Sequence, residues 1–127
     1  AGTTTRISVL TAGAQANGGG SYQVTITDNG DFVVFSTGAD NLVDNDTNGH
    51  ADVFSHDRRT GITRRHSLTT AHTGGNYYSG RPSVSPDGKY IAFESDATNF
   101  VDDDDNSIRD VFLARGPELI FADGFEY

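Results

Sequence analysis

Short runs of alternating or apolar residues recur along this chain, separated by Gly, Asn, Asp and Pro. The two most apolar runs, residues 31–36 and 89–95, each follow a turn sequence, Asp-Asn-Gly or Pro-Asp-Gly. Runs of this length bounded by turn residues predict β-strands. No segment keeps an apolar helical period, so we expect an all-β protein. The other predicted strands are residues 5–10, 21–27, 51–57, 62–68, 80–85 and 109–115.

The predicted strands occur in the same order twice. When the sequence is aligned with itself, Thr5–Arg58 matches Thr63–Gly116 without a gap, and identical pairs such as Gly30/Gly88 and Phe35/Phe93 recur along the match. A long fixed period that contains strands is typical of propeller blades. We therefore predict two four-stranded, propeller-type blades. The expected units are residues 1–58, residues 59–116 and a C-terminal tail, residues 117–127.

The order of the strands leaves the first one, Thr5–Leu10, without a partner in its own repeat. We expect it to pair with Arg109–Arg115, within the chain or from the next chain, which would give a ring or a filament. A generic β-sandwich and a piece of a longer propeller are the alternatives. The residues predicted to take part in self-assembly are Arg6, Ile7, Val9, Leu10, Val111 and Phe112, with Leu119, Ile120 and Phe121 from the tail.

Each repeat contains one strongly acidic loop. In the first loop the residues follow the order D-x-D-x-N-G-x-x-D, which is similar to the opening of a calcium loop built from oxygen ligands. We predict two Ca²⁺ sites, with solvated acidic loops as the alternative. The predicted ligands are Asp44, Asp46, Asn48, Asp52 and the carbonyl of His50, and in the second loop Asp102, Asp104, Asn106, Asp110 and the carbonyl of Ile108.

The composition limits the kinds of binding partner that are expected. The formal charge of −9 repels phosphate backbones, so nucleic acid is not expected, and no apolar run is long enough for membrane insertion. Tyr77 and Tyr78 lie in a Gly-rich connection and could hold a glycan or a cell-surface component. The sequence shows no converging acid, base and nucleophile, so we predict no catalytic residue.

The stretch SVSPDGKYIAFES, residues 83–95, resembles the repeat of TolB-type, WD40-like (PD40) β-propellers, and residues 26–36 are a looser copy. The acidic loop with its flanks resembles a variant of those blades in exported bacterial proteins. The segment IFADGFE, residues 120–126, is similar to C-terminal segments of exported proteins of Gram-negative bacteria. These resemblances imply a propeller-type fold in a secreted or cell-surface protein.

These observations predict a secreted, calcium-binding structural protein that assembles with copies of itself. The first alternative is an extracellular binding module for a glycan or a partner protein. The second is a hydrolase or lyase whose active site is built from distant propeller loops.

Overall fold

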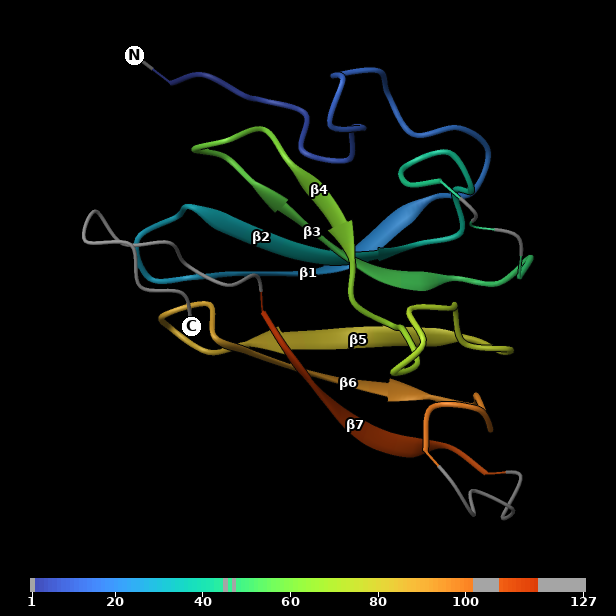
Figure 1. The fold of residues 1–127 in the computed structure, drawn as a ribbon. Helices are drawn as coiled ribbons and strands as arrows, with labels where there is room; N and C mark the ends of the chain where they lie inside the picture. The colour runs from blue at the N-terminus through green and yellow to red at the C-terminus, as the bar shows by residue number, and fades with distance from the viewer. Residues whose placement is uncertain (1, 45, 47, 102–107, 117–127) are drawn as a thin grey trace.

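The computed structural model describes residues 2–44, 46, 48–101 and 108–116, and it confirms the all-β prediction. Every strand pairing in these ranges is antiparallel, and they contain no helix that could cross a membrane. Figure 1 shows the seven strands. They are β1 (Ser21–Ile26), β2 (Phe32–Thr37), β3 (Asp52–Asp57), β4 (Thr63–Arg65), β5 (Ser79–Val84), β6 (Tyr90–Ser95) and β7 (Asp110–Arg115).

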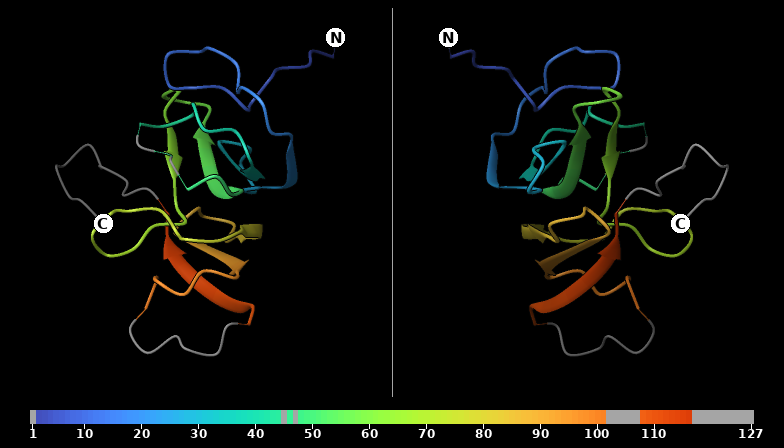
Figure 2. Two further views of the ribbon diagram at one scale, coloured as in Figure 1. Left: turned by 90° about the vertical axis from the view of Figure 1, so that its right-hand side faces the viewer. Right: turned by 90° about the vertical axis from the view of Figure 1, so that its left-hand side faces the viewer.

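The strands form two sheets, each a meander in chain order. The first sheet has the order β1-β2-β3-β4 and the second has the order β5-β6-β7. The registers correspond, because Phe35 faces Phe54 in the first sheet and Phe93 faces Phe112 in the second. The views at right angles in Figure 2 keep the two sheets in separate layers.

The turns that open β2 and β6 are built alike. Gly30 and Gly88 have φ values of 76° and 78°, a region that glycine enters without steric cost. The side chains of Asn29 and Asp87 accept hydrogen bonds from the backbone N–H groups of Asp31 and Lys89. Both turn sequences therefore specify the hairpins that the sequence predicts.

The core between the sheets is made by one face of each. Val34 and Val53 of the first sheet pack with Ile91 and Phe93 of the second, and all four are buried. Contacts from β5 to β1, β2 and β3 hold the layers together. On the other face of the first sheet, a second cluster consists of Phe35, Ala39, Leu42 and Phe54 with the half-buried Ile7 and Leu10.

The predicted first strand is not present in this chain. Within Thr5–Leu10, Val9 alone forms a bridge, and it pairs with Gln15 in a tight local turn. Thr63 Oγ1 donates a hydrogen bond of 2.6 Å to the carbonyl of Val9, which places this segment beside β4. Figures 1 and 2 show it at the opposite end of the molecule from β7, so the predicted pairing with β7 within the chain is wrong. Burial of Ile7 and Leu10 on the first sheet explains this position.

The gapless alignment of the repeats is also wrong before β1. It matches Val9 with Ser67, whereas the bridge between Val9 and Gln15 recurs as the bridge between Leu68 and Gly74. The hydrogen bond from Ala16 N to Ser8 O recurs with the same offset, from Gly75 N to Ser67 O. The first repeat therefore has one extra residue between this turn and β1.

The propeller prediction is confirmed only at the level of fold class. The described residues form two packed sheets and no closed ring, and the second sheet has three strands in place of the expected four. The first unit was expected to end at residue 58. The strand β4 lies beyond that boundary but pairs with β3, so the first sheet extends to Arg65.

Candidate functional site

The first acidic loop turns two of its carboxylates into the molecule. Asp46 and Asp52 are 6% and 0% exposed, whereas Asp44 lies on the surface. Asp52 is the first residue of β3 and faces Thr37 of β2, so the strand pairing fixes its position. Asn48 Nδ2 donates to Asp52 Oδ1 at 3.0 Å and to the carbonyl of Gly75 at 2.7 Å, which ties the loop to the following segment.

The buried carboxylates share one cationic partner, Arg65 of β4. Its Nη1 atom lies 3.1 Å from Asp46 Oδ1 and 3.8 Å from Asp52 Oδ2, and its side chain is 5% exposed. Ser67 completes the site, because its hydroxyl donates to Asp52 Oδ1 at 2.9 Å and accepts from Val53 N at 3.1 Å. This arrangement joins β4 and the segment after it to the start of β3.

Gly74 makes room for this guanidinium. A Cβ atom at Gly74 would lie 3.0 Å from Arg65 Nη1, so a larger residue would force the arginine to shift. Gly74 also forms the bridge with Leu68, which places it at the end of the local turn. The turn and the arginine are therefore packed as one unit.

Burial dominates the electrostatics of the pair. Burial and the charge of Asp46 together raise the pKa of Asp52 to about 7, against the hydrogen bonds from Ser67 and Asn48 and the charge of Arg65. Burial likewise raises the pKa of Asp46. Among the described residues, Asp46 Oδ2, Asp52 Oδ2, Arg65 Nε and Arg65 Nη1 are buried without a hydrogen-bond partner. One guanidinium therefore serves two carboxylates, and the Oδ2 atom of each accepts no hydrogen bond.

The structure brings together three of the predicted ligands of the first calcium site, Asp46, Asn48 and Asp52. Asp44 is exposed, and the ring of His50 packs against Tyr77 with 5.4 Å between the ring centroids. The described ranges contain no group of three or more His, Cys, Asp or Glu side chains that could hold a metal ion. Calcium at this loop stays a prediction, and Arg65 already supplies a positive charge to the carboxylates.

Most of the second loop lies outside the described residues, namely the predicted ligands Asp102, Asp104 and Asn106. Ile108 is 62% exposed, and Asp110 opens β7 opposite Ser95, as Asp52 opens β3 opposite Thr37. The tail residues predicted for self-assembly, Leu119, Ile120 and Phe121, also fall outside the described part of the chain.

The sequence analysis did not assign Arg65 or Ser67 to the acidic loop of their own chain. The signal that could have found them is the pattern Arg-x-Ser, which occurs at Arg65-His66-Ser67 and again at Arg6-Ile7-Ser8. The two copies are related by the same offset that relates the bridge residues Val9 and Leu68 of the turns after them. The gapless alignment, which matches Thr5 with Thr63, hides this correspondence.

The two tyrosines predicted to bind a ligand have different surroundings. Tyr77 is 51% exposed and contacts His50. Tyr78 is half-buried, donates to Gln23 Oε1 at 3.1 Å and lies under the guanidinium of Arg109 at 4.9 Å from the ring centroid. Of the two, Tyr77 has the more exposed ring, and the binding of a glycan or a cell-surface component by Tyr77 and Tyr78 stays a prediction.

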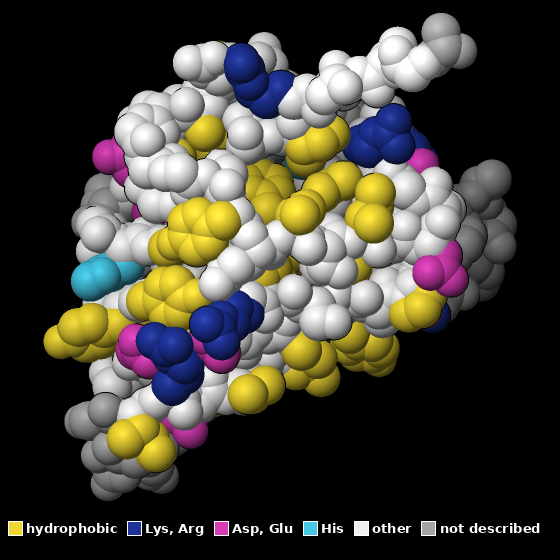
Figure 3. Space-filling view, turned by 180° about the vertical axis from the view of Figure 1, so that it is seen from behind, with side chains coloured by type: hydrophobic (Ala, Val, Ile, Leu, Met, Phe, Trp, Pro, Cys, Tyr) yellow, Lys and Arg dark blue, Asp and Glu magenta, His cyan; other side chains and the backbone are white. Residues whose placement is uncertain are grey.

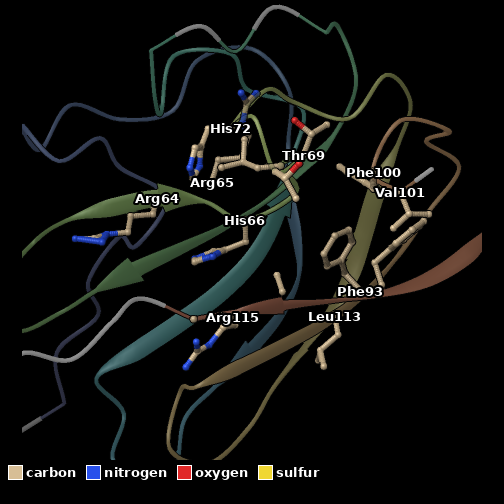
Figure 4. A pocket seen from close by; sticks show the side chains of 15 residues that line it. Arg64, Arg65, His66, Thr69, His72, Phe93, Phe100, Val101, Leu113 and Arg115 are labelled. Atoms are coloured by element: carbon tan, nitrogen blue, oxygen red, sulfur yellow. The ribbon is translucent and has the colours of Figure 1, made fainter. Parts of the chain in front are cut away.

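A cleft of about 660 Å³ separates the segment after β4 from the second sheet. Figure 4 shows Arg64, Arg65 and His66 on one side of it and Phe93 and Leu113 on the other. A hydrogen bond of 2.7 Å joins the Nε2 atom of His66 to Ser55 Oγ. Burial and the charge of Arg64 together lower the pKa of His66 to about 4, and the backbone of Arg115 opposes both. The cleft lies beside β7, at the position that corresponds to the place of β4 beside β3 in the first sheet.

Equivalent positions on β3 and β7 differ sharply in exposure. Val53 is 0% exposed, whereas Val111 at the same position of β7 is 79% exposed. Ser55 is 1% exposed, whereas its counterpart Leu113 is 69% exposed. We call Val111 and Leu113 the tail surface. They lie on the face of the second sheet that corresponds to the face of the first sheet on which the second sheet packs.

The face of the first sheet that points away from the second sheet also carries two exposed apolar side chains. Val24 and Ile26 of β1 are 68% and 54% exposed. Their counterparts in β5 are Pro82, which is buried, and Val84, which packs against the core between the sheets. We call Val24 and Ile26 the head surface. Figure 3 shows hydrophobic side chains spread over one face of the molecule, between charged ones.

The residues predicted for self-assembly are distributed over both ends. Arg6 is exposed and donates from Nη1 to Gln15 Oε1 at 2.6 Å, whereas Ile7 and Leu10 pack on their own sheet. Val9 forms the local bridge, and Val111 belongs to the tail surface. Phe112 points inward beside Phe93 and Phe100.

Comparison with known proteins identifies no relative. No family model, no curated protein and no solved structure matches this chain.

Proposed function

We propose that this chain is a secreted structural protein that assembles head to tail with copies of itself. Each sheet acts as a propeller-type blade, and the contact between the sheets within one chain repeats between chains. Within the chain, β5 packs against β1, β2 and β3, and Val84 enters the shared core. By the same geometry, the head surface of one copy packs on the tail surface of another.

The observation that carries this proposal is the difference in exposure between equivalent positions. Val53 is covered because a second sheet lies on it, and Val111 is 79% exposed because none does. Exposed apolar side chains grouped on one face are typical of an interaction surface. The head and tail surfaces differ, so the contact is heterologous and leads to a ring or an open filament.

The apolar area supplies part of the free energy of association. Fully burying a Val, Leu or Ile side chain is worth roughly 1.5–3 kcal/mol, and each interface would cover Val24, Ile26, Val111 and Leu113. Association costs roughly 4–15 kcal/mol in lost freedom, so this patch alone gives weak binding. Backbone pairing along an open strand edge would add to it.

Sedimentation velocity over a range of protein concentrations tests the proposal. The expected result is mass that grows with concentration above the 13.6 kDa of one chain. The double variant Val111→Ser/Leu113→Ser should stay small, because the tail surface loses its apolar side chains. Ile108→Ser, which changes an exposed residue just before β7, serves as the control and should assemble normally. A chain that remains a monomer at every concentration would overturn the proposal.

Calcium binding at the acidic loops forms the second part of the proposal. The Oδ2 atoms of Asp46 and Asp52, which accept no hydrogen bond, support it, because hard cations prefer carboxylate oxygens, and Arg65 counts against it. Thermal unfolding in millimolar CaCl₂ and after chelation provides the test. Bound Ca²⁺ should raise the midpoint of the wild type, and it should raise that of Asp44→Asn less than half as much. An unchanged midpoint in the wild type would leave Arg65 as the cation of this loop.

A further inference from the structure

The fourth strand of the first sheet shows how an open edge of this fold is closed. The strand β4 pairs with β3 so that Arg65 faces Phe54 and Arg64 faces Ser55. The pairing continues beyond β4, because His66 N donates to the carbonyl of Val53 at 2.8 Å. Arg65 and Ser67 then fasten this segment to the carboxylate of Asp52, the first residue of β3.

The chain carries a second copy of this closing segment near its start. With the offset that relates Val9 to Leu68, Thr4, Arg6 and Ser8 correspond to Thr63, Arg65 and Ser67. The local turn that follows Ser8 has the same hydrogen bonds as the turn that follows Ser67. The turn is thus formed, but residues 4–6 lie in no strand and are exposed to solvent.

The chain also has a second edge that this segment fits. In the described part of the second sheet, β7 is an edge strand, and its pairing with β6 matches the pairing of β3 with β2. Asp110, Val111 and Phe112 therefore stand where β3 has Asp52, Val53 and Phe54. Within one molecule the two parts lie at opposite ends, as Figures 1 and 2 show, so the segment cannot close the edge of its own chain in this conformation.

We infer that residues Thr4–Arg6 of one copy pair with β7 of a second copy, and that Arg6 and Ser8 bind Asp110 of that copy. The inference rests on the proposed head-to-tail assembly and specifies its register. By the pairing of β4 with β3, Arg6 faces Phe112, Thr5 faces Leu113 and Thr4 faces Ala114. The occupant of the β7 edge is thus a second copy of this chain.

The chemistry of the contact favours this occupant. Backbone bonds along a strand edge are the same for any extended peptide, so side chains must supply selectivity. A guanidinium and a hydroxyl that meet one carboxylate give charge-assisted hydrogen bonds, which are stronger than neutral ones. Asp104, which corresponds to Asp46 in sequence, lies outside the described residues. The inference needs only Asp110.

The edge of β7 also borders the cleft described above. The cleft is lined by Phe112, Leu113 and Ala114 on one side and by Leu68 and Thr69 on the other. In the first sheet, the hydroxyl of Thr63 on the closing strand donates to the carbonyl of Val9. A donated Thr4 would take the place of Thr63 and bond to the carbonyl of Leu68, which corresponds to Val9. The donated strand thereby fills part of the cleft.

Disulfide trapping tests the register, because the natural sequence contains no cysteine. A chain with Thr5→Cys is mixed with a chain with Leu113→Cys under mild oxidation. Facing residues of paired strands bring their Cβ atoms within about 4.5–5.5 Å, which a small shift makes compatible with a disulfide. The expected product is a covalent pair of chains. The register control, Thr5→Cys with Val111→Cys, should give at least roughly fivefold less product, since diagonal partners lie about 7–8 Å apart.

Charge reversal tests the role of Arg6. A chain with Arg6→Asp keeps an intact β7, and a chain with Asp110→Arg keeps an intact Arg6. Each alone should associate at least roughly tenfold more weakly than the wild type, whereas their mixture should form a species of two or more chains. Arg58→Gln removes one positive charge from the turn between β3 and β4 and serves as the control.

The outcomes separate the inference from the proposed function. If the wild type assembles but the control cysteine pair reacts as well as the matched pair, or Arg6→Asp assembles normally, the register is wrong and the assembly stands. If the wild type stays monomeric and no pair reacts, both fail. If the matched pair reacts only after removal of residues 117–127, the edge belongs to the chain's own tail, which overturns the inference.

Discussion

The two sheets have nearly the same strand order and register, yet they differ in what covers them. The first sheet has four strands, and every residue of β2 and β3 is buried. The described second sheet has three strands, and the residues of β7 alternate between half-buried and exposed. The burial of a strand in this fold is therefore set by the neighbouring repeat as much as by the strand's own sequence.

Truncating the equivalent phenylalanines gives the largest expected difference between the sheets. Phe54 is fully buried between β2 and the N-terminal segment, so Phe54→Ala should lower the free energy of unfolding by about 3–5 kcal/mol. Phe112→Ala should cost less in the monomer, because Phe112 is only half-buried. Urea denaturation at low protein concentration measures both. Equal losses would show that the two sheets are covered alike in solution.

Adjacent arginines of β4 give the next largest contrast. Arg65→Ala leaves two buried carboxylates without their cation, which should cost roughly 3 kcal/mol or more. Arg64→Ala changes an exposed neighbour and should stay within about 0.5 kcal/mol of the wild type. The measurement is again the free energy of unfolding in urea. If both variants are equally stable, Arg65 does not hold the first sheet closed.

A third contrast is the dependence of stability on pH that comes from His66, which lines the cleft beside the second sheet. Its pKa of about 4 in the folded protein lies below the value of about 6.5 in the unfolded chain. At this imidazole the unfolded chain therefore binds more protons between these values, so the contribution of His66 to stability falls as the pH drops from about 6.5 towards 4, whereas the raised pKa of Asp52 acts in the opposite direction. His66→Gln should lose less stability than the wild type over this range, in urea midpoints taken at both ends.

His72→Gln is the matched control for this experiment, because His72 lies exposed on the turn after His66. It should follow the wild type at every pH. A His66→Gln variant with the same pH dependence as the wild type would place the imidazole of His66 in solvent.

Much of the fold could be predicted from local pattern. The alternation of residues and the turn sequences around Gly30 and Gly88 located six of the seven strands to within about one residue, because strand and turn chemistry is local. The strand predicted at residues 62–68 is shorter, since β4 ends at Arg65. The failure at Thr5–Leu10 has a different cause. A strand needs a partner, and sequence pattern does not show whether the partner lies in the same chain.

The candidate site was predictable only in part. Three oxygen-bearing residues of the first loop do converge, because the entry into β3 fixes Asp52 and draws Asp46 and Asn48 towards it. Their main partner, Arg65, could not be read from the loop, since it lies on the next strand and reaches Asp52 only through the pairing of β4 with β3. A motif of acidic residues indicates a positive partner without saying whether it is a metal ion or an arginine.

The extra residue before β1 has a consequence for how such a protein can evolve. The repeats differ in length only at a surface connection, while the strand pairings and the Arg-x-Ser segment keep their spacing within each unit. A tandem duplication of one unit would therefore insert a new sheet between the existing ones and leave both terminal surfaces as they are. Gene length could vary in whole repeats without any change in the residues that meet at each joint.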